Sequence, residues 1–162
     1  YREYFDRLRA MLKPDGVALL HSIGCMSGPH PLDPWISKYI FPGGYIPGLS
    51  EVLPAVERCR LYVTDMEILY PHYADTIRAW RNRFMASRQR AAELYDERFC
   101  RMWEYYLVCS EIAFRRLNHM VFQMQLAHDP FAVPATRDYI HAGEREARRQ
   151  RPTLVPDRQK AS

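Results

Sequence analysis

Residues 17–24 constrain the fold of this chain more than any other stretch. Residues 17–20 are apolar on consecutive positions, and the run ends in His21, Ser22 and Gly24. Consecutive rather than alternating apolar residues are typical of a strand that is covered on both faces, as in a parallel sheet between two layers of helices. Open α/β sheets bind their ligands beyond the carboxyl ends of the strands. The stretch therefore predicts a buried strand that leads into a functional site.

The rest of the pattern predicts helices and strands around this strand. Apolar residues recur at helical spacing over residues 1–12, and Pro14 and Gly16 end that helix before the strand begins. An aromatic loop with one or two helical turns then predicts a functional connection rather than a linker. Further along, we expect a helix over 50–58, capped by Ser50 and with Pro54 in its first turn. A strand over 60–69 should follow it. We then expect two helices, from His72 and from Asp96, that lie as a pair against the sheet, and a last strand over 120–127.

Composition limits the class of protein. The chain has 162 residues, 48% of them apolar, which suffices for one packed domain. A balance of 23 Lys and Arg against 19 Asp and Glu is compatible with an anionic membrane surface or nucleic acid, but a solvated basic surface explains it as well. Four cysteines without a C-x-x-C pair predict neither a disulfide framework nor a structural zinc site, and so favour a reducing cytoplasm. The apolar run that starts at Val17 is far shorter than the roughly 20 residues of a membrane helix.

Domain limits follow from the same pattern. We expect one α/β domain over residues 1–129 and an extended or disordered tail over 130–162, since the last residues offer almost nothing to bury. About three strands are too few to cover the strand at residues 17–23 on both faces and edges. The missing neighbours are expected upstream of Tyr1 or in a partner chain.

Several side chains are candidates for chemistry, each with a structural alternative. His21 is as compatible with a core histidine as with a catalytic or binding one. Tyr73 lies on a helical stripe, where aromatic residues usually belong to the core, and Cys25 is best explained as a small buried thiol. The six histidines show no H-x-x-x-H spacing, so no metal site is predicted. From these residues alone the reaction is not readable.

Specific strings add to this pattern. They are LHSIG at 20–24, PWISKYIFPGGYIP at 34–47, HYADT at 72–76 and YDERF at 95–99. With them the chain, from Tyr1 to about His128, closely resembles the C-terminal half of the cyclopropane-fatty-acyl-phospholipid synthases. These enzymes are related to the mycolic acid cyclopropane synthases within the class I S-adenosylmethionine-dependent methyltransferases.

The resemblance implies a Rossmann-like sheet of which this chain supplies the last three strands, the final two antiparallel. It also implies transfer of the S-adenosylmethionine methyl group to a cis double bond of a phospholipid acyl chain, with a bound bicarbonate ion taking the proton lost as the ring closes. The bicarbonate-binding positions of the family correspond to His21, the backbone at Ile23, and Tyr73, and its catalytic positions correspond to His21 and Tyr73. A histidine, a strand-end N–H and a phenol are suitable donors to a small oxyanion. The loop over 24–47 would line the acyl chain.

The same resemblance sets limits. The family's glycine-rich cofactor loop, its ribose-binding acidic residue and two further bicarbonate contacts would all precede Tyr1, so we expect no cofactor-binding residue in this chain and no activity from it alone. The expected setting is the cytoplasm, at the inner face of the membrane, with no nucleic acid partner and with a homodimer as one way to cover the sheet edge. Two alternatives stay open: methylation of an unsaturated lipid without ring closure, and a non-catalytic lipid-binding or dimerisation module.

Overall fold

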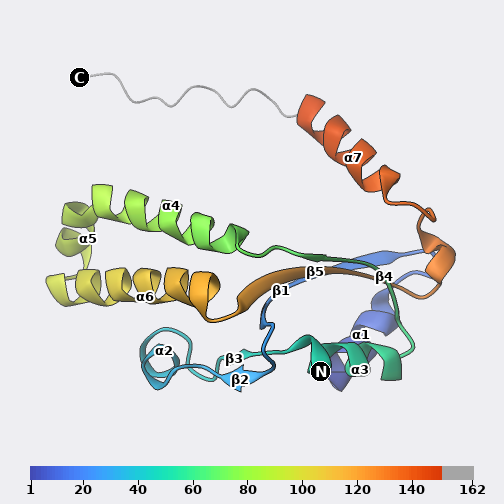
Figure 1. The fold of residues 1–162 in the computed structure, drawn as a ribbon, viewed down its shortest axis with the longest axis horizontal. Helices are drawn as coiled ribbons and strands as arrows, with labels where there is room; N and C mark the ends of the chain where they lie inside the picture. The colour runs from blue at the N-terminus through green and yellow to red at the C-terminus, as the bar shows by residue number, and fades with distance from the viewer. Residues whose placement is uncertain (151–162) are drawn as a thin grey trace.

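Three strands form the central sheet of the molecule (Figure 1). The computed structural model describes residues 1–150, and in it the strands β1 (Val17–Cys25), β5 (His119–Ala127) and β4 (Tyr62–Ile68) lie in the order β1-β5-β4. β5 runs antiparallel to both of its neighbours. β1 and β4 are therefore parallel to each other, with the last strand inserted between them. This arrangement confirms the α/β class and the predicted antiparallel final pair.

Two helices cover one face of this sheet. They are α1 (Arg2–Met11) and α3 (Leu49–Arg58), which lie on the same side of the strands in Figure 1. Phe5 of α1 and Val56 of α3 are buried with alternate side chains of β5, among them Phe122 and Met124. Because side chains alternate between the two faces of a strand, these residues of β5 point toward the helices. The prediction that one face of β5 is more exposed to solvent than the other is therefore confirmed.

The other face of β1 is open in the described part of the chain. Burial alternates along the strand, and Val17, Leu19 and Ile23 keep 42%, 62% and 39% of their surface exposed. The prediction of a strand covered on both faces is therefore wrong for residues 1–150. The physical reason is that α1 and α3 lie on the same side, so every second apolar residue of β1 has no helix against it.

Two long helices extend beyond one end of the sheet (Figure 1). α4 (His72–Ala86) and α6 (Glu97–Arg116) lie side by side, joined by α5 (Arg88–Leu94). Their buried contact consists of Ala74, Ile77, Leu107 and Phe114, and it meets the sheet at Val121. The prediction that this pair lies against the sheet is wrong, because only its near end contacts a strand. The predicted start of the second helix at Asp96 is confirmed, and the Asp96 carboxylate caps it by accepting the Phe99 N–H at 2.6 Å.

A small hairpin lies in the aromatic loop after β1. β2 (His30–Pro31) pairs with β3 (Tyr45–Ile46), and the short helix α2 (Pro34–Tyr39) connects them. Asp33 caps α2 by accepting the N–H groups of Trp35 and Ile36, so the predicted helical turn is confirmed. The loop is ordered by its own hydrogen bonds.

α3 differs from its prediction at the amino end. The helix begins at Leu49 with Gly48 as N-cap, and Ser50 does not cap it. Pro54 therefore lies inside the helix rather than in its first turn, where it removes one backbone donor. The helix tolerates this cost because Val52 and Val56 are buried against the sheet on either side of the proline.

Residues 130–149 are not an extended tail. They form a short 3₁₀ turn, η1 (Pro130–Ala132), and the helix α7 (Asp138–Arg149). Arg137 pairs with Asp65 of β4 at 2.7 Å, and the Tyr139 hydroxyl donates to Gln125 of β5 at 2.7 Å. These polar contacts attach the start of α7 to the sheet. The sequence prediction considered only apolar residues and therefore did not include them. Residues 151–162 lie outside the described residues, and the division into domain and tail stays a prediction.

None of the described helices is suited to cross a membrane. In residues 1–150 no helix is both long enough and apolar enough for one. α6 is the longest, with 20 residues, and it carries charged side chains along its length, including Glu97, Arg101 and Glu111.

Candidate functional site

His21 lies on the open face of the sheet, between the exposed side chains of Leu19 and Ile23. The β1–β5 register places it opposite Gln123, whose Nε2 lies 3.1 Å from the His21 Nδ1. An amide nitrogen only donates, so Nδ1 accepts and the neutral ring carries its proton on Nε2. Within residues 1–150, His21 thus keeps one N–H donor free for a ligand on the open face.

Tyr73 reaches the same end of the sheet through α4. Leu69, just after β4, donates its N–H to the Val121 carbonyl at 2.8 Å, and α4 begins three residues later. Tyr73 packs against the buried cluster that includes Val121, and Val121 is the partner of Ile23 in the ladder. Ile23 is thus linked to the surroundings of Tyr73 through its ladder partner Val121. β1 thus carries His21 and Ile23 and α4 carries Tyr73, while the binding roles of the three residues stay predictions.

Aromatic rings surround Tyr73. Its ring centroid lies 5.0 Å from that of Phe114 and 5.7 Å from that of Trp80. Ring faces attract cations through their quadrupole, so such a cluster suits a reaction in which positive charge develops on the substrate.

The aromatic loop packs against α6 next to this cluster. Phe41 lies 5.9 Å from Tyr106, and Trp35 lies 4.6 Å from Tyr105, measured between ring centroids. Burial raises the pKa of Tyr106, and the nearby Tyr73 phenol acts in the same direction, against a hydrogen bond to Ser110. The aromatic loop and Tyr73 therefore both pack against aromatic residues of α6.

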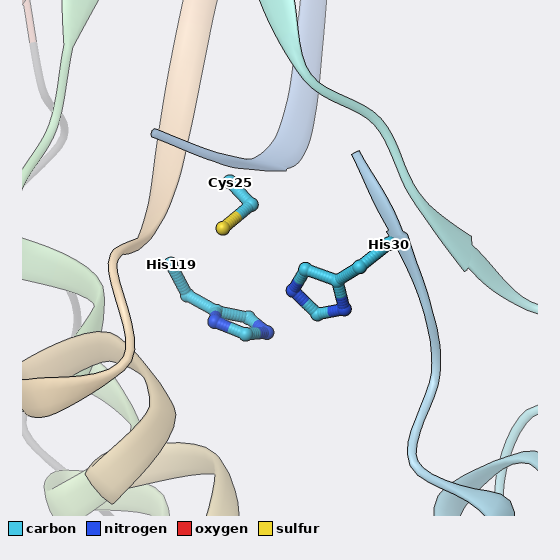
Figure 2. A group of neighbouring side chains, drawn as sticks. All are labelled: Cys25, His30 and His119. Atoms are coloured by element: carbon cyan, nitrogen blue, oxygen red, sulfur yellow. The ribbon is translucent and has the colours of Figure 1, made fainter. Parts of the chain in front are cut away.

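Three side chains that can bind metals meet at the end of β1, from Cys25, His30 and His119 (Figure 2). Their donor atoms all lie within 4.8 Å of one another. Burial lowers the pKa of His119, with His30 as a lesser cause in the same direction and a bond to the Leu117 carbonyl opposing both. The argument from histidine spacing missed this group because its members come from three different strands. Only the pairing of β1 with β5 brings Cys25 and His119 together.

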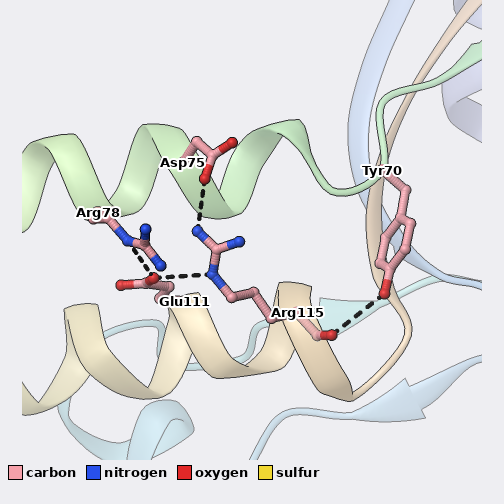
Figure 3. Close-up of polar contacts among 5 residues, drawn as sticks. All are labelled: Tyr70, Asp75, Arg78, Glu111 and Arg115. Carbon is pink, nitrogen blue, oxygen red and sulfur yellow. Dashed lines mark hydrogen bonds and ion pairs between the residues drawn. The ribbon is translucent and has the colours of Figure 1, made fainter.

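An ion-pair network joins α4 to α6 (Figure 3). Arg78 and Arg115 donate to the same oxygen of Glu111, at 2.8 and 3.0 Å, and Arg115 also reaches Asp75 at 2.6 Å. Burial raises the pKa of Glu111, but the hydrogen bonds from Arg115 and Arg78 outweigh it, and the pKa lies below its ordinary value. The network lines a cleft of about 420 Å³. The sequence pattern did not predict this network.

Comparison with known sequences identifies relatives of this chain. The family model described as mycolic acid cyclopropane synthetase matches residues 1–124. The tuberculostearic acid methyltransferase UfaA1 of Mycobacterium tuberculosis is 38% identical over 132 residues, which cover 78% of this chain and 31% of that protein. The cyclopropane-fatty-acyl-phospholipid synthase of Escherichia coli is 37% identical over 124 residues, covering 76% of this chain and 32% of that enzyme. The chain thus spans about a third of the length of these relatives.

Solved structures agree with the sequence relatives. The cyclopropane synthase MmaA2 from Mycobacterium tuberculosis superposes with a TM-score of 0.71 at 28% identity, over 78% of this chain and 49% of that one. The mycolic acid cyclopropane synthase CmaA1, complexed with SAH and CTAB, gives the same TM-score and identity. These homologues are S-adenosylmethionine-dependent methyltransferases, so the predicted fold family is confirmed. By its sequence match and its fold, the chain belongs to the mycolic acid cyclopropane synthetase family.

Proposed function

We propose that this chain is the C-terminal part of an S-adenosylmethionine-dependent lipid methyltransferase that cyclopropanates cis double bonds of phospholipid acyl chains. One observation supports this most: the family match over residues 1–124 includes both β1, which carries His21 and Ile23, and the start of α4, which carries Tyr73. Val121, the ladder partner of Ile23, belongs to the buried cluster against which Tyr73 packs.

The donor set fits a small oxyanion such as bicarbonate. In the described part of the chain His21 keeps its Nε2–H free because Gln123 donates to Nδ1, and the Tyr73 hydroxyl would supply a second donor. Bicarbonate, when bound, supplies the base for the proton that is released as the ring closes. His21 and Tyr73 would orient it by hydrogen bonds, and the rings of Trp80 and Phe114 would favour positive charge on the substrate.

S-adenosylmethionine supplies the methyl group when bound, and we assign none of its contacts to this chain. The acyl chain would lie along the aromatic wall formed by the loop over 24–47 and α6. The exposed apolar residues of β1 and a net charge of +4 suit work at the cytoplasmic surface of an anionic membrane.

A second function has a specific observation in its favour. UfaA1 is called a tuberculostearic acid methyltransferase, and it is 38% identical to this chain. Methyl transfer to an unsaturated acyl chain without ring closure would use the same donors and the same aromatic wall. His21 and Tyr73 do not distinguish the two outcomes, because both reactions begin with the same methyl transfer.

The test compares this chain with a longer polypeptide that also contains the sequence encoded upstream of it. Each is incubated with vesicles of an unsaturated phospholipid and S-adenosylmethionine labelled in its methyl group, and the released acyl chains are identified by gas chromatography and mass spectrometry. We expect a labelled cyclopropane from the longer polypeptide and none from the chain alone. A labelled methyl branch without a ring would favour the second function. Vesicle binding by the longer polypeptide without any labelled product would contradict both and favour a non-catalytic lipid-binding module.

A further inference from the structure

We propose that Cys25, His30 and His119 form a binding site for one Zn²⁺ ion, with a fourth coordination position left for water or an external ligand. The three side chains point toward one another (Figure 2), and their donor atoms lie within 4.8 Å. One sulfur and two imidazole nitrogens are the ligands that zinc prefers. Oxygen-binding cations such as Mg²⁺ and Ca²⁺ do not fit this donor set.

The fold holds the three residues from separate strands. Cys25 and His119 are direct partners in the β1–β5 ladder, and the Met26 N–H donates to the Asn118 carbonyl at 2.9 Å. Asn118 has a positive φ of 59°, which turns the chain from α6 into β5 at this point. His119 therefore starts its strand beside the end of β1.

His30 comes from the hairpin in the aromatic loop. It pairs with Ile46, and the next carbonyl, that of Pro47, accepts the Cys25 N–H at 2.9 Å. Gly24 permits this approach, because a Cβ at that position would lie 3.0 Å from the Pro47 oxygen. The hairpin is thus attached to the end of β1 by backbone bonds that do not depend on a metal.

Both histidines are oriented as metal ligands are. The Nδ1 of His30 lies 2.8 Å from the Pro31 carbonyl, and the Nδ1 of His119 lies 3.1 Å from the Leu117 carbonyl. A carbonyl only accepts, so each Nδ1 carries the proton and each Nε2 keeps its lone pair. A ligating histidine in proteins usually donates its other N–H to such a group, which fixes the ring and raises its basicity.

The distances require only a small contraction. Ligands of a tetrahedral zinc at about 2.0–2.3 Å from the ion are roughly 3.3–3.8 Å apart, so the widest pair would close by about 1–1.5 Å. Rotation of half-buried histidine side chains supplies such a shift. Ser27 lies with its hydroxyl 3.1 Å from the Cys25 sulfur and can donate to the thiolate that metal binding requires. The bound ion would fasten the aromatic loop to the central sheet.

Metal binding is tested on the full chain without a polyhistidine tag, reduced and stripped by a chelator. Zn²⁺ is titrated by calorimetry, and Co²⁺ is titrated with the visible and near-ultraviolet absorption recorded. We expect one Zn²⁺ per chain and a thiolate-to-cobalt charge-transfer band. Cys25→Ser should abolish that band, and Cys25→Ser, His30→Gln and His119→Gln should each weaken Zn²⁺ binding by about tenfold or more.

Two matched variants serve as controls. Cys109→Ser removes another free thiol and His141→Gln removes an exposed imidazole on α7, and both should bind Zn²⁺ as the unmodified chain does. Far-ultraviolet circular dichroism confirms that each variant is folded, and Zn²⁺ should raise the Tm of the unmodified chain but not that of Cys25→Ser. If the folded unmodified chain binds no Zn²⁺ at micromolar concentrations, or if the controls lose as much affinity as the ligand variants, the three side chains are merely packed together and the proposal is wrong.

Discussion

The Nδ1 of His21 accepts a hydrogen bond from the Nε2 of Gln123, directly across the β1–β5 ladder at 3.1 Å. A histidine on an exposed strand face has no packing to hold its ring. Gln123 therefore fixes the tautomer of His21 and directs the remaining N–H toward the open face. In the proposed enzyme Gln123 is a positioning residue, since it acts on bicarbonate only through His21.

Gln123→Met should weaken bicarbonate binding without destroying catalysis. Loss of one hydrogen bond of about 1 kcal/mol raises the bicarbonate concentration for half-maximal rate by roughly fivefold, with kcat nearly unchanged at saturation. The measurement is cyclopropane formation by the longer polypeptide at increasing bicarbonate in carbon-dioxide-depleted buffer. Gln125→Met is the control, because Gln125 lies two residues further along β5 and bonds Tyr139 instead. Equal bicarbonate curves for the two variants would contradict the role of Gln123.

Tyr73→Phe should lower the rate of ring formation while leaving the fold intact. The substitution removes only the hydroxyl, and the ring keeps its packing against Trp80 and Phe114. A hydrogen bond to a charged ligand contributes about 1.5–3 kcal/mol, so we expect a loss of roughly tenfold to a hundredfold at low bicarbonate. Product is quantified as for Gln123→Met, with the exposed Tyr62→Phe as control. An unchanged rate would show that the Tyr73 hydroxyl does not bind the anion.

The sequence pattern predicted where helices and strands lie better than it predicted which elements pack against them. Asp96 and Asp33 cap helices where the pattern indicates helix starts, because a cap depends on residues only two or three positions away. The apolar run of β1 predicted two covered faces, but coverage depends on which side α1 and α3 take. The same limit applies to α7, whose attachment through Arg137 and Tyr139 depends on partners in β4 and β5.

The candidate sites show this difference as well. The resemblance indicated His21, Ile23 and Tyr73 by their strings, and Val121, the ladder partner of Ile23, belongs to the cluster against which Tyr73 packs. Cys25 and His119 are 94 positions apart, and no local spacing in the sequence predicts that they pair across the β1–β5 ladder. A cluster assembled by pairing of distant strands becomes visible only once the register is known.

Glu111→Gln should destabilise the pair of helices α4 and α6. Glu111 is only 8% exposed and accepts from both Arg78 and Arg115, so the neutral amide loses the negative charge that strengthens both bonds. We expect the free energy of unfolding to fall by about 1–3 kcal/mol, measured in urea. Glu57→Gln, on the exposed side of α3, should change it little. If both substitutions have the same effect, the network does not stabilise the fold.

The same carboxylate predicts how stability depends on pH. The folded pKa of Glu111 lies below its ordinary value, so in acid the unfolded chain binds the proton first. The stabilisation is complete above the ordinary pKa of a glutamate and is lost as the pH falls through the lowered pKa. Urea unfolding of the unmodified chain between neutral and acid pH should therefore show a decline that is smaller in Glu111→Gln. Parallel curves for the two proteins would contradict the assigned direction of the shift.

Leu19→Lys should reduce self-association of this chain. Among the described residues β1 is an edge strand, and Val17, Leu19 and Ile23 form an exposed apolar row beside its unpaired backbone groups. Such an edge is a template for pairing with a second copy, and a lysine on an edge strand opposes it by charge and hydration. Size-exclusion chromatography with light scattering at increasing concentration should show association of the unmodified chain and less of it in the variant.

Leu94→Lys is the matched control for that experiment. Leu94 is 70% exposed against 62% for Leu19, but it lies at the end of α5, away from any strand. If association is driven by exposed apolar surface in general, the two lysine variants should reduce it equally. If it is driven by the open edge and face of β1, only Leu19→Lys should do so, because a helix end offers no row of backbone donors and acceptors. An unmodified chain that stays monomeric throughout would show that the open face of β1 does not recruit a second copy.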